Sequence, residues 1–222
     1  MNEGLILIGG AARFPGREIA RSLAASRRLL LWDRSGEALS DCLAAWPAAE
    51  QPRQWVRDPA EVAGLVDDLR SRLEAEAVRI EHFVHCAGTL SSELLSRGGA
   101  GALARTLAAG VYSALEVIKV LTGRRSNAGA LRSILLVSLA PVPCGPSATS
   151  PVCGALGALA RALAVEFAPD LRVNALVVSA GLGAAPQAAR DGVAGLAEFL
   201  LSDAARWITG QELFAGRGAL RE

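Results

Sequence analysis

Three glycines and an aspartate have the types and spacing of a nucleotide-phosphate site. Gly9, Gly10 and Gly16 lie in the stretch LILIGGAARFPGREIARSLA, between a short apolar run and a segment with helical periodicity. A glycine-rich turn in that context brings backbone N–H groups and a helix N-terminus to a pyrophosphate. Asp33 ends the next apolar run, where a carboxylate accepts hydrogen bonds from an adenosine ribose. The alternative is that Gly10 and Gly16 only form a tight turn and that Asp33 caps a helix beginning near Ser35.

The chain also contains a histidine and thiols that could do other chemistry. His85 and Cys86 are adjacent at the end of an apolar run, and a thiol near an imidazole can be a nucleophile. Adjacent residues of a strand point to opposite faces, however, so these two are poorly placed to pair. Cys144 and Cys153 flank a loop at 140–151 and could approach one another, although inert thiols are the simpler expectation. The four cysteines and two histidines lack zinc-ligand spacing, so no metal site is predicted.

The elements that must position these residues can be predicted from periodicity. Short apolar runs alternate with Ala-rich helical segments, which is typical of a mostly parallel sheet with crossover helices. Right-handed crossovers then place the carboxyl ends of the strands at one sheet edge, where ligands bind. The sequence predicts one Rossmann-like α/β domain over 1–222, doubly wound, with a seven-stranded sheet and helices on both faces. The expected strands are 5–9, 28–33, 53–58, 80–88, 131–138, 171–179 and 212–216, and the expected helices are 16–26, 36–46, 60–77, 101–121, 153–168 and 192–201.

Bulk composition argues against several classes of partner. Lys+Arg total 23 against 22 Asp+Glu, a formal net charge of +1, so neither a nucleic-acid footprint nor a polybasic membrane patch is expected. The apolar run in MNEGLILIGG is too short to span a membrane, and no later stretch approaches the roughly 20 apolar residues that a spanning helix needs. Together with free thiols, these features predict a soluble cytoplasmic protein that binds neither nucleic acid nor membrane.

Taken together, the motifs resemble the short-chain dehydrogenase/reductase family, including its 3-oxoacyl-ACP reductase-like members, over nearly the whole chain. The turn IGGAARFPGREIA resembles the family's Thr-Gly-x-x-x-Gly-x-Gly, HCAG at 85–88 its Asn-Asn-Ala-Gly, RVNAL at 172–176 the strand before the nicotinamide loop, and FLLSDAARWITGQEL at 199–213 its C-terminal signature. The resemblance implies an oxidoreductase-like fold that binds NAD or NADP. The cofactor-binding residues that it implies are Gly10, Arg13, Gly16, Asp33, Asp58, Ala87 and Gly88.

The glycine-rich turn departs from the family pattern. Gly9 replaces the opening Thr, Phe14 replaces the middle glycine, and Pro15 follows. A bulky side chain and a missing N–H therefore stand where backbone should approach the diphosphate closely. We expect binding of NAD or NADP to be weak or lost.

The choice of dinucleotide and the substrate side are less defined. Asp33 would repel a 2′-phosphate, whereas Arg13 and Arg34 could bind one, and the balance slightly favours NAD. After the sixth predicted strand, the family's Pro-Gly pair reads Val178-Ser179, and the following segment is shorter than the family's usual substrate lid. A buried substrate pocket would need walls from elsewhere.

The family's catalytic pair is missing. Carbonyl reduction of this kind needs a proton donor, and the family uses a Tyr whose pKa is lowered by a Lys four residues later, with a Ser that orients the carbonyl. Matching ATSPVCGALGALARALAVEF to the family helix puts Thr149 at the Tyr position and Cys153 at the Lys position, and neither replaces the lost role. The only Tyr and the only Lys, Tyr112 and Lys119, lie on another predicted helix at the wrong spacing. Ser138 is the only retained catalytic candidate.

Two predicted helices, 101–121 and 153–168, match the segments through which family members associate. The first carries Leu107 where the family has its proton-relay Asn. A helix that is apolar on most sides should be covered on most sides, so we expect a homo- or hetero-oligomer, a dimer or tetramer, formed through these helices. The second helix has small and aliphatic residues along one stripe, namely Leu156, Leu159, Ala160 and Leu163.

Three functions remain open. The first is a catalytically degenerate family member, a pseudoenzyme acting as a non-catalytic or regulatory subunit, paired with itself or with an active homologue such as a ketoacyl reductase. The second is an NAD(P)-dependent oxidoreductase or a non-redox enzyme with an unusual site around Ser138, His85 or the 140–151 loop. The third is a dinucleotide- or metabolite-sensing module. The missing Tyr/Lys pair favours the first, while whether the chain is an enzyme stays open.

Overall fold

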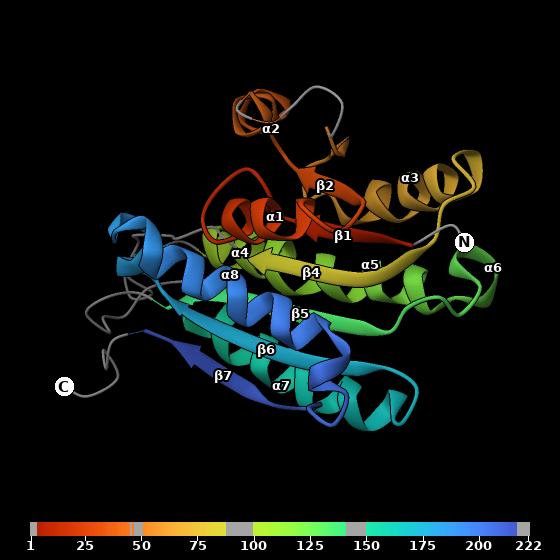
Figure 1. The fold of residues 1–222 in the computed structure, drawn as a ribbon. Coiled ribbons are helices and arrows are strands. Elements are labelled where there is room, and N and C mark those ends of the chain that lie inside the picture. The colour runs from red at the N-terminus through yellow and green to blue at the C-terminus, as the bar shows by residue number, and fades with distance from the viewer. Residues whose placement is uncertain (1–3, 45, 47–50, 88–99, 141–149, 217–222) are drawn as a thin grey trace.

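The sheet contains seven strands, all parallel, in the order β3-β2-β1-β4-β5-β6-β7 (Figure 1). The computed structural model describes residues 4–44, 46, 51–87, 100–140 and 150–216. The predicted doubly wound, Rossmann-like sheet is confirmed. The strands are β1 (Leu5–Gly9), β2 (Leu29–Asp33), β3 (Arg53–Val56), β4 (Ile80–Ala87), β5 (Ser133–Ala140), β6 (Arg172–Ser179) and β7 (Glu212–Ala215).

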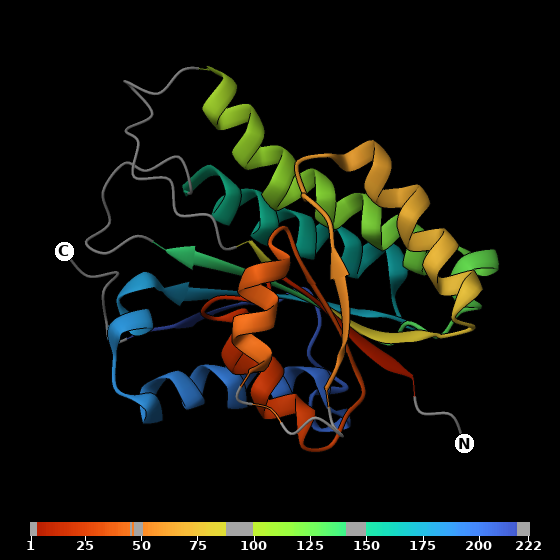
Figure 2. The ribbon, with the colours of Figure 1, turned by 90° about the horizontal axis from the view of Figure 1, so that it is seen from above.

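Helices cover both faces of this sheet (Figure 2). One face carries α3 (Val62–Ala75), α7 (Ser150–Phe167) and a long helix made of α4 (Ala100–Leu107), the π-helical turn η2 (Ala108–Tyr112) and α5 (Ser113–Thr122). The other face carries α1 (Gly16–Ala24), α2 (Gly36–Leu43) and α8 (Gln187–Leu201). The connections include the short helices α6 (Arg124–Asn127), η3 (Ala180–Ala184) and η4 (Asp203–Ala205).

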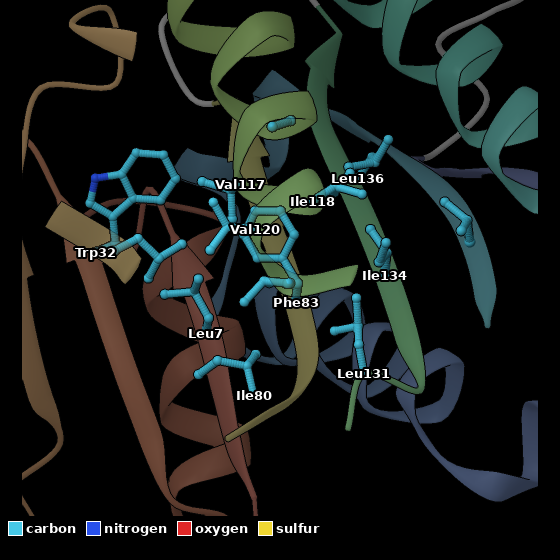
Figure 3. Packing of buried hydrophobic residues seen from close by; sticks show 14 of the residues in the cluster. Leu7, Trp32, Ile80, Phe83, Val117, Ile118, Val120, Leu131, Ile134 and Leu136 are labelled. Atoms are coloured by element: carbon cyan, nitrogen blue, oxygen red, sulfur yellow. The ribbon is translucent and has the colours of Figure 1, made fainter. Parts of the chain in front are cut away.

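An apolar cluster on each face holds the layers together. On β5, Leu136 belongs to the cluster under α3, α5 and α7, whereas Leu135 and Val137 belong to the cluster under α1, α2 and α8. Figure 3 shows the first cluster, in which Phe83 of β4 lies among the side chains of α5, including Val117. Because both faces of a parallel sheet are buried, its strands form nearly continuous apolar runs, which explains why they are recognisable in the sequence.

The chain reverses its path across the sheet between β1 and β4. It moves outward from β1 through β2 to β3, and then returns to the other side of β1 to form β4. In open α/β sheets, ligands bind at the carboxyl ends of the strands on either side of such a reversal. The turn that follows Gly9 and the end of β4 at Ala87 therefore flank the expected crevice.

Several boundaries differ from the sequence prediction. The helix expected over 101–121 is interrupted by the π turn, which takes one extra residue into a helical turn. The first described residue of α7 is Ser150, and α8 begins at Gln187, so both helices start earlier than expected. β3 ends at Val56, so Asp58 lies beyond the strand and not at its end.

One helix, Gly101–Thr122, is long and apolar enough to cross a membrane by length and composition. The expectation that no stretch has this character is therefore corrected. Val117, Ile118 and Leu121 pack its inner side in the cluster on the sheet, and one such helix is weak evidence for a membrane span. Only 28% of its apolar window is buried within the chain, which leaves much of its outer side uncovered.

Candidate functional site

The turn between β1 and α1 requires glycine at two positions. Gly10 has a φ of +71°, and a Cβ built on it would lie 2.3 Å from the carbonyl oxygen of Cys86. A Cβ on Gly16 would lie 2.3 Å from the carbonyl oxygen of Gly10. The backbone of the tight turn therefore requires glycine at both positions, as the alternative predicted. This requirement is compatible with a ligand bound at the turn.

Most of the N–H groups that can be traced in this turn are already used by the protein. Gly10 and Ala11 donate to the Trp32 carbonyl at 2.9 and 3.2 Å. Ala12 donates to Asp33 Oδ2 at 3.0 Å, and Arg17 donates to the carbonyl of the turn itself. Pro15 has no N–H to donate. The turn is thus a poorer diphosphate cradle than its glycine spacing suggests.

Asp33 lies at the carboxyl end of β2 and faces the turn. Its Oδ1 accepts the Ser35 N–H at 3.4 Å, while Ser35 Oγ caps α2 by accepting the Ala38 N–H at 3.1 Å. The alternative that Asp33 itself caps this helix is therefore wrong. A carboxylate has about four lone-pair sites, so its contacts with backbone leave capacity for ligand hydroxyls.

A cleft of about 480 Å³ opens at this edge of the sheet. Its first end lies over β1 and β2, and its second end lies beside β5, α7 and the segment after β6. The residues of the first end are Gly10, Arg13, Trp32, Asp33, Arg34 and Pro59; those of the second end are Leu139, Val152, Cys153, Ala180 and Gly183; and those between are Phe14, His85, Cys86, Thr106, Ala109 and Gly110.

The cleft brings together some, but not all, of the predicted cofactor residues. Asp58 is absent from the described lining, whereas its neighbour Pro59 belongs to it. Asp58 Oδ1 accepts the Ala60 N–H at 2.9 Å. Ala87 ends β4, and Gly88 lies outside the described residues. Their roles as cofactor contacts stay predictions.

An aromatic floor explains why Gly9 replaces a larger residue. A Cβ on Gly9 would lie 2.7 Å from Trp32 Cε3 and 3.3 Å from His85 Nδ1. The Trp32 ring lies 5.0 Å from that of Trp55 and 5.9 Å from that of His85, and all three side chains are buried. The sequence signal for this packing is that Gly9 stands where the family turn has Thr, together with the large rings of Trp32 and His85. The spacing of the glycines alone does not reveal this contact.

His85 connects this floor to the π turn. Its Nε2 lies 2.9 Å from the carbonyl oxygen of Gly110, the middle residue of η2. In the neutral tautomer with the proton on Nε2, the imidazole donates to this carbonyl. Burial lowers the pKa of His85 to about 4, with the bond to Gly110 acting in the opposite direction. As predicted, Cys86 belongs to the cluster on the other face, so it does not pair with His85.

The second end of the cleft has a thiol at the predicted lysine position. Cys153 Sγ donates to the Leu139 carbonyl at 3.3 Å and also contacts the Ser138 hydroxyl. Burial raises the pKa of the Cys153 thiol, which therefore carries no charge to lower the pKa of a neighbouring acid. Ser138 is only 2% exposed, and Leu139 is the β5 residue found in the described lining. Thr149 and Cys144 lie outside the described residues.

No side chain in the described lining is a proton donor near neutral pH. His85 is neutral there, and burial raises the pKa of both lining thiols, Cys86 and Cys153. Tyr112 is 56% exposed and is absent from this lining, as is Lys119, whose ammonium pairs with Glu116 at 2.6 Å. The lining is therefore unlike an acid/base site for carbonyl reduction.

Phe14 extends from the turn toward the second end of the cleft. A Cβ built on Gly183 would lie 3.3 Å from Phe14 Cδ1, so the ring contacts the η3 segment after β6. Phe14 and Leu182 both pack on the cluster beneath. The first end of the cleft offers a carboxylate and two guanidinium groups to a nucleotide, and Phe14 lines the cleft between this end and the second.

Solved structures with this fold are short-chain dehydrogenases and reductases. An oxidoreductase of that family from Burkholderia thailandensis is 27% identical, with a TM-score of 0.77 over 100% of this chain and 94% of the other. A glucose/ribitol-type member from Brucella melitensis is 22% identical, with a TM-score of 0.79 over 97% and 96%. A short-chain dehydrogenase from Bacillus anthracis is 15% identical, with a TM-score of 0.82 over 99% and 97%.

No family model and no curated protein matches the sequence. The assignment therefore depends on the strand order, the connections and the nearly complete coverage of these structures. Nicotinamide dinucleotides are the cofactors of this family, although the fold alone does not show that this chain binds one. The chain has the fold of the short-chain dehydrogenase/reductases.

Proposed function

We propose that this chain is a catalytically degenerate short-chain dehydrogenase/reductase that acts as a non-catalytic or regulatory subunit in the cytoplasm. Its partner is a second copy of itself or an active homologue. The observation that carries the proposal is the substrate end of the cleft, where Cys153 and Leu139 stand and the described lining offers no acid. A fold that keeps its cleft and lacks the catalytic acid can still bind a ligand, associate with another subunit and stabilise an assembly.

The outer face of α7 supports association. Gly154, Ala158 and Ala162 recur every four residues along it and are exposed, and Val165 is 83% exposed. Helices with small residues at this spacing can approach one another closely. The neighbouring long helix also has an uncovered apolar side. The proposal is that another subunit covers both surfaces.

The proposal is tested by measuring the mass and the activity of the purified protein together. Light scattering after size exclusion is expected to give a dimer or tetramer, because two apolar helix faces need cover. Incubation with NADH or NADPH and a ketone or β-ketoacyl substrate is expected to give no steady oxidation of the cofactor. Steady oxidation by the protein alone would overturn the proposal in favour of an oxidoreductase, and a strictly monomeric protein that binds no homologue would overturn the subunit role.

A further inference from the structure

We infer that the amino edge of the sheet is a docking surface for a short acidic segment of another protein. This edge lies at the opposite end of the strands from the cleft, where the N-terminus and α6 are found (Figure 1). The inference goes beyond the proposed function, which concerns the cleft and the outer faces of α7 and the long helix. Two observations carry it: the strand pairing aligns arginines along this edge, and the described residues give these arginines no carboxylate partner.

Strand pairing places three arginines, here called the arginine row, along this edge. The carbonyls of Arg28 and Arg79 accept N–H groups from the start of β1 at 3.0 and 2.8 Å, so these residues lie on either side of that strand. The Arg132 N–H donates to the carbonyl of Glu81 in β4 at 2.8 Å, which places Arg132 next along the edge. Neighbouring strands lie about 4.8 Å apart, so the row extends over about 15 Å.

The arginines of this row are exposed and have no described counter-charge. Arg28, Arg79 and Arg132 are exposed, and so is Arg27 beside them. No ion pair within the described part of the chain includes any of them. Arg79 donates to the carbonyl of Val78 at 3.2 Å, which leaves most of its N–H groups available. Available guanidinium groups bind carboxylates through paired hydrogen bonds.

A buried imidazole shows that these charges act on a common region. Burial lowers the pKa of His82 to about 4, and the charges of Arg27, Arg172 and Arg132 lower it further. Arg27 precedes β2 and Arg132 precedes β5, so charges from both ends of the row reach one point in β4. An acidic segment along this edge therefore meets several cations at once.

The carboxylates at this edge do not cancel the row. Asp203 belongs to η4, whose last carbonyl binds Arg172 at the start of β6, and Asp170 precedes the same strand. Both acids therefore lie beyond the β5 end of the row. Within the row, Glu81 contributes a half-buried carboxylate, whose side chain lies against the backbone of Gly4. Charge is thus separated along the edge, basic from β2 to β5 and acidic beyond it.

The short helix α6 extends the basic stretch. Asn127 is fully buried, and its side-chain amide accepts the Ile80 N–H and donates to the Ile80 carbonyl, both at 2.8 Å. These two hydrogen bonds hold α6 against the start of β4, next to Arg79. Since α6 begins with Arg124 and Arg125, the chain adds two more arginines at this place.

The length of the row sets the kind of partner. About 15 Å corresponds to about ten residues of helix, and one helical turn rises about 5.4 Å. Carboxylates one turn and then two further turns apart match one strand step from Arg132 to Arg79 and two from Arg79 to Arg28. A long polyphosphate is less favoured, because the chain has a formal net charge of only +1 and acids follow the row. A short acidic protein segment is the partner that this edge fits.

The inference is tested by fluorescence anisotropy with the purified chain and a labelled peptide of about ten glutamates. This peptide is expected to bind at least about tenfold more tightly than a glycine-serine peptide of the same length, and to lose at least about tenfold in affinity between about 0.05 and about 0.5 M salt. No binding at millimolar concentration would overturn the inference. Tighter binding of a single-stranded oligothymidylate of the same length would overturn it as well, because the edge would then be a nucleic-acid surface.

Matched pairs of substitutions locate the surface. Arg79→Gln together with Arg132→Gln is expected to weaken polyglutamate binding at least about tenfold. Arg13→Gln together with Arg34→Gln is the control, because it removes the same charge from two exposed arginines at the cleft, on the opposite edge of the sheet. The control should change the affinity by less than about threefold. Equal losses in the two pairs would show that net charge alone matters and would overturn the site.

Arg27→Gln together with Arg28→Gln is a second pair, from the other end of the row. It is expected to weaken binding at least about fivefold, and it decides the question if the first pair lowers the thermal stability of the chain. These outcomes are separable from those of the proposed function. A chain that associates but leaves the peptide unbound keeps the subunit role and loses this inference. A monomeric chain that binds the peptide through the arginine row keeps this inference and loses the subunit role.

Discussion

The two buried imidazoles, His82 and His85, make the stability of this protein depend on pH. Burial lowers the pKa of His82 to about 4, with further lowering by Arg27, Arg172 and Arg132, and burial lowers the pKa of His85 to about 4. Both start from an ordinary value of 6.5, so between pH 6.5 and 4 the unfolded chain binds two protons that the folded chain does not. The free energy of unfolding must therefore fall as the pH falls through this window, and it is unaffected by these groups above it.

We expect each histidine to remove about 2 kcal/mol of stability between pH 7.5 and pH 5. Urea unfolding at both pH values measures this loss. His85→Gln keeps a donor near the Gly110 carbonyl and should reduce the loss by about half. Since these are the only two histidines, the pair His82→Asn and His85→Gln should remove most of the dependence. An unchanged slope in the double variant would contradict the buried neutral imidazoles.

The second residue-scale prediction concerns Gly9 beneath the Trp32 ring. Gly9→Ala puts a Cβ at 2.7 Å from Trp32 Cε3, inside a fully buried aromatic floor that cannot move away freely. Overpacking of this kind costs about 1–3 kcal/mol, which thermal unfolding would detect. Gly64→Ala is the control, because no heavy atom lies within 4 Å of its Cβ and it sits in α3. This change should stabilise by about 0.5–1 kcal/mol, and similar effects of the two changes would contradict the packing.

At the scale of elements, Arg172 joins the start of β6 to the end of α8. Its guanidinium donates to the carbonyls of Leu200, Leu201, Ser202 and Ala205 at 2.6 to 3.3 Å. Leu200 and Leu201 end α8, Ser202 follows it and Ala205 ends η4. The last carbonyls of a helix have no partner within it, and the positive charge also favours that end of the helix dipole. One side chain thus completes a helix and fixes it to the sheet.

Arg172→Ala is expected to destabilise the protein by about 2–4 kcal/mol, because it leaves several partly buried carbonyls without donors. Arg172→Lys should recover little, since an ammonium cannot reach four carbonyls with fork geometry. Chemical denaturation measures both. Arg70→Ala is the matched control, because Arg70 is 53% exposed and its contact with Asp67 is 3.8 Å long, so a change below about 0.5 kcal/mol is expected.

Elements were more predictable from the sequence than the site. All seven strands and the six main helical segments appear within a few residues of their expected places, because buried parallel strands and amphipathic helices leave strong periodic signals. The π turn at Ala108–Tyr112 leaves no such signal, since it shifts the period by one residue over a single turn. The hydrogen bond from His85 is accepted by a carbonyl of this turn, that of Gly110, and the sequence did not predict it either.

Within the site, the sequence predicts which catalytic residues are missing but not which side chains occupy the cleft. The absence of a Tyr/Lys pair follows from composition, and the structure places Tyr112 and Lys119 outside the described lining. Phe14 was recognisable as too large for its position, but its contact with Gly183 joins segments far apart in the chain and depends on tertiary packing. The predicted role of Ser138 is still untested.

At the scale of the whole molecule, the uncovered helix faces give the subunit proposal its own prediction. Ala158→Glu places a charge in the middle of the exposed small-residue face of α7. If another subunit covers this face, the change should lower the mass in solution to that of a monomer, because burying an unpaired carboxylate is costly. Size exclusion with light scattering measures the result.

The control is Ala188→Glu, at an exposed alanine in the first turn of α8, on the other face of the sheet from both association helices. It should leave the mass unchanged. Neither change should alter the secondary structure of the folded chain, since both positions face away from its core. Equal masses for the two variants and the parent would show that α7 is not the covered surface.

The contact between Phe14 and Gly183 also bears on whether the proposed loss of catalysis could be reversed by substitution. Thr149→Tyr and Cys153→Lys together would introduce the residue types of the family's catalytic pair at the predicted positions, yet Phe14 would still line the cleft beside Gly183, and Pro15 would still lack an N–H. Removing the Phe14 ring alone would widen a cleft whose described lining offers no acid. If the chain is catalytically degenerate as proposed, we expect neither change to give turnover without the other.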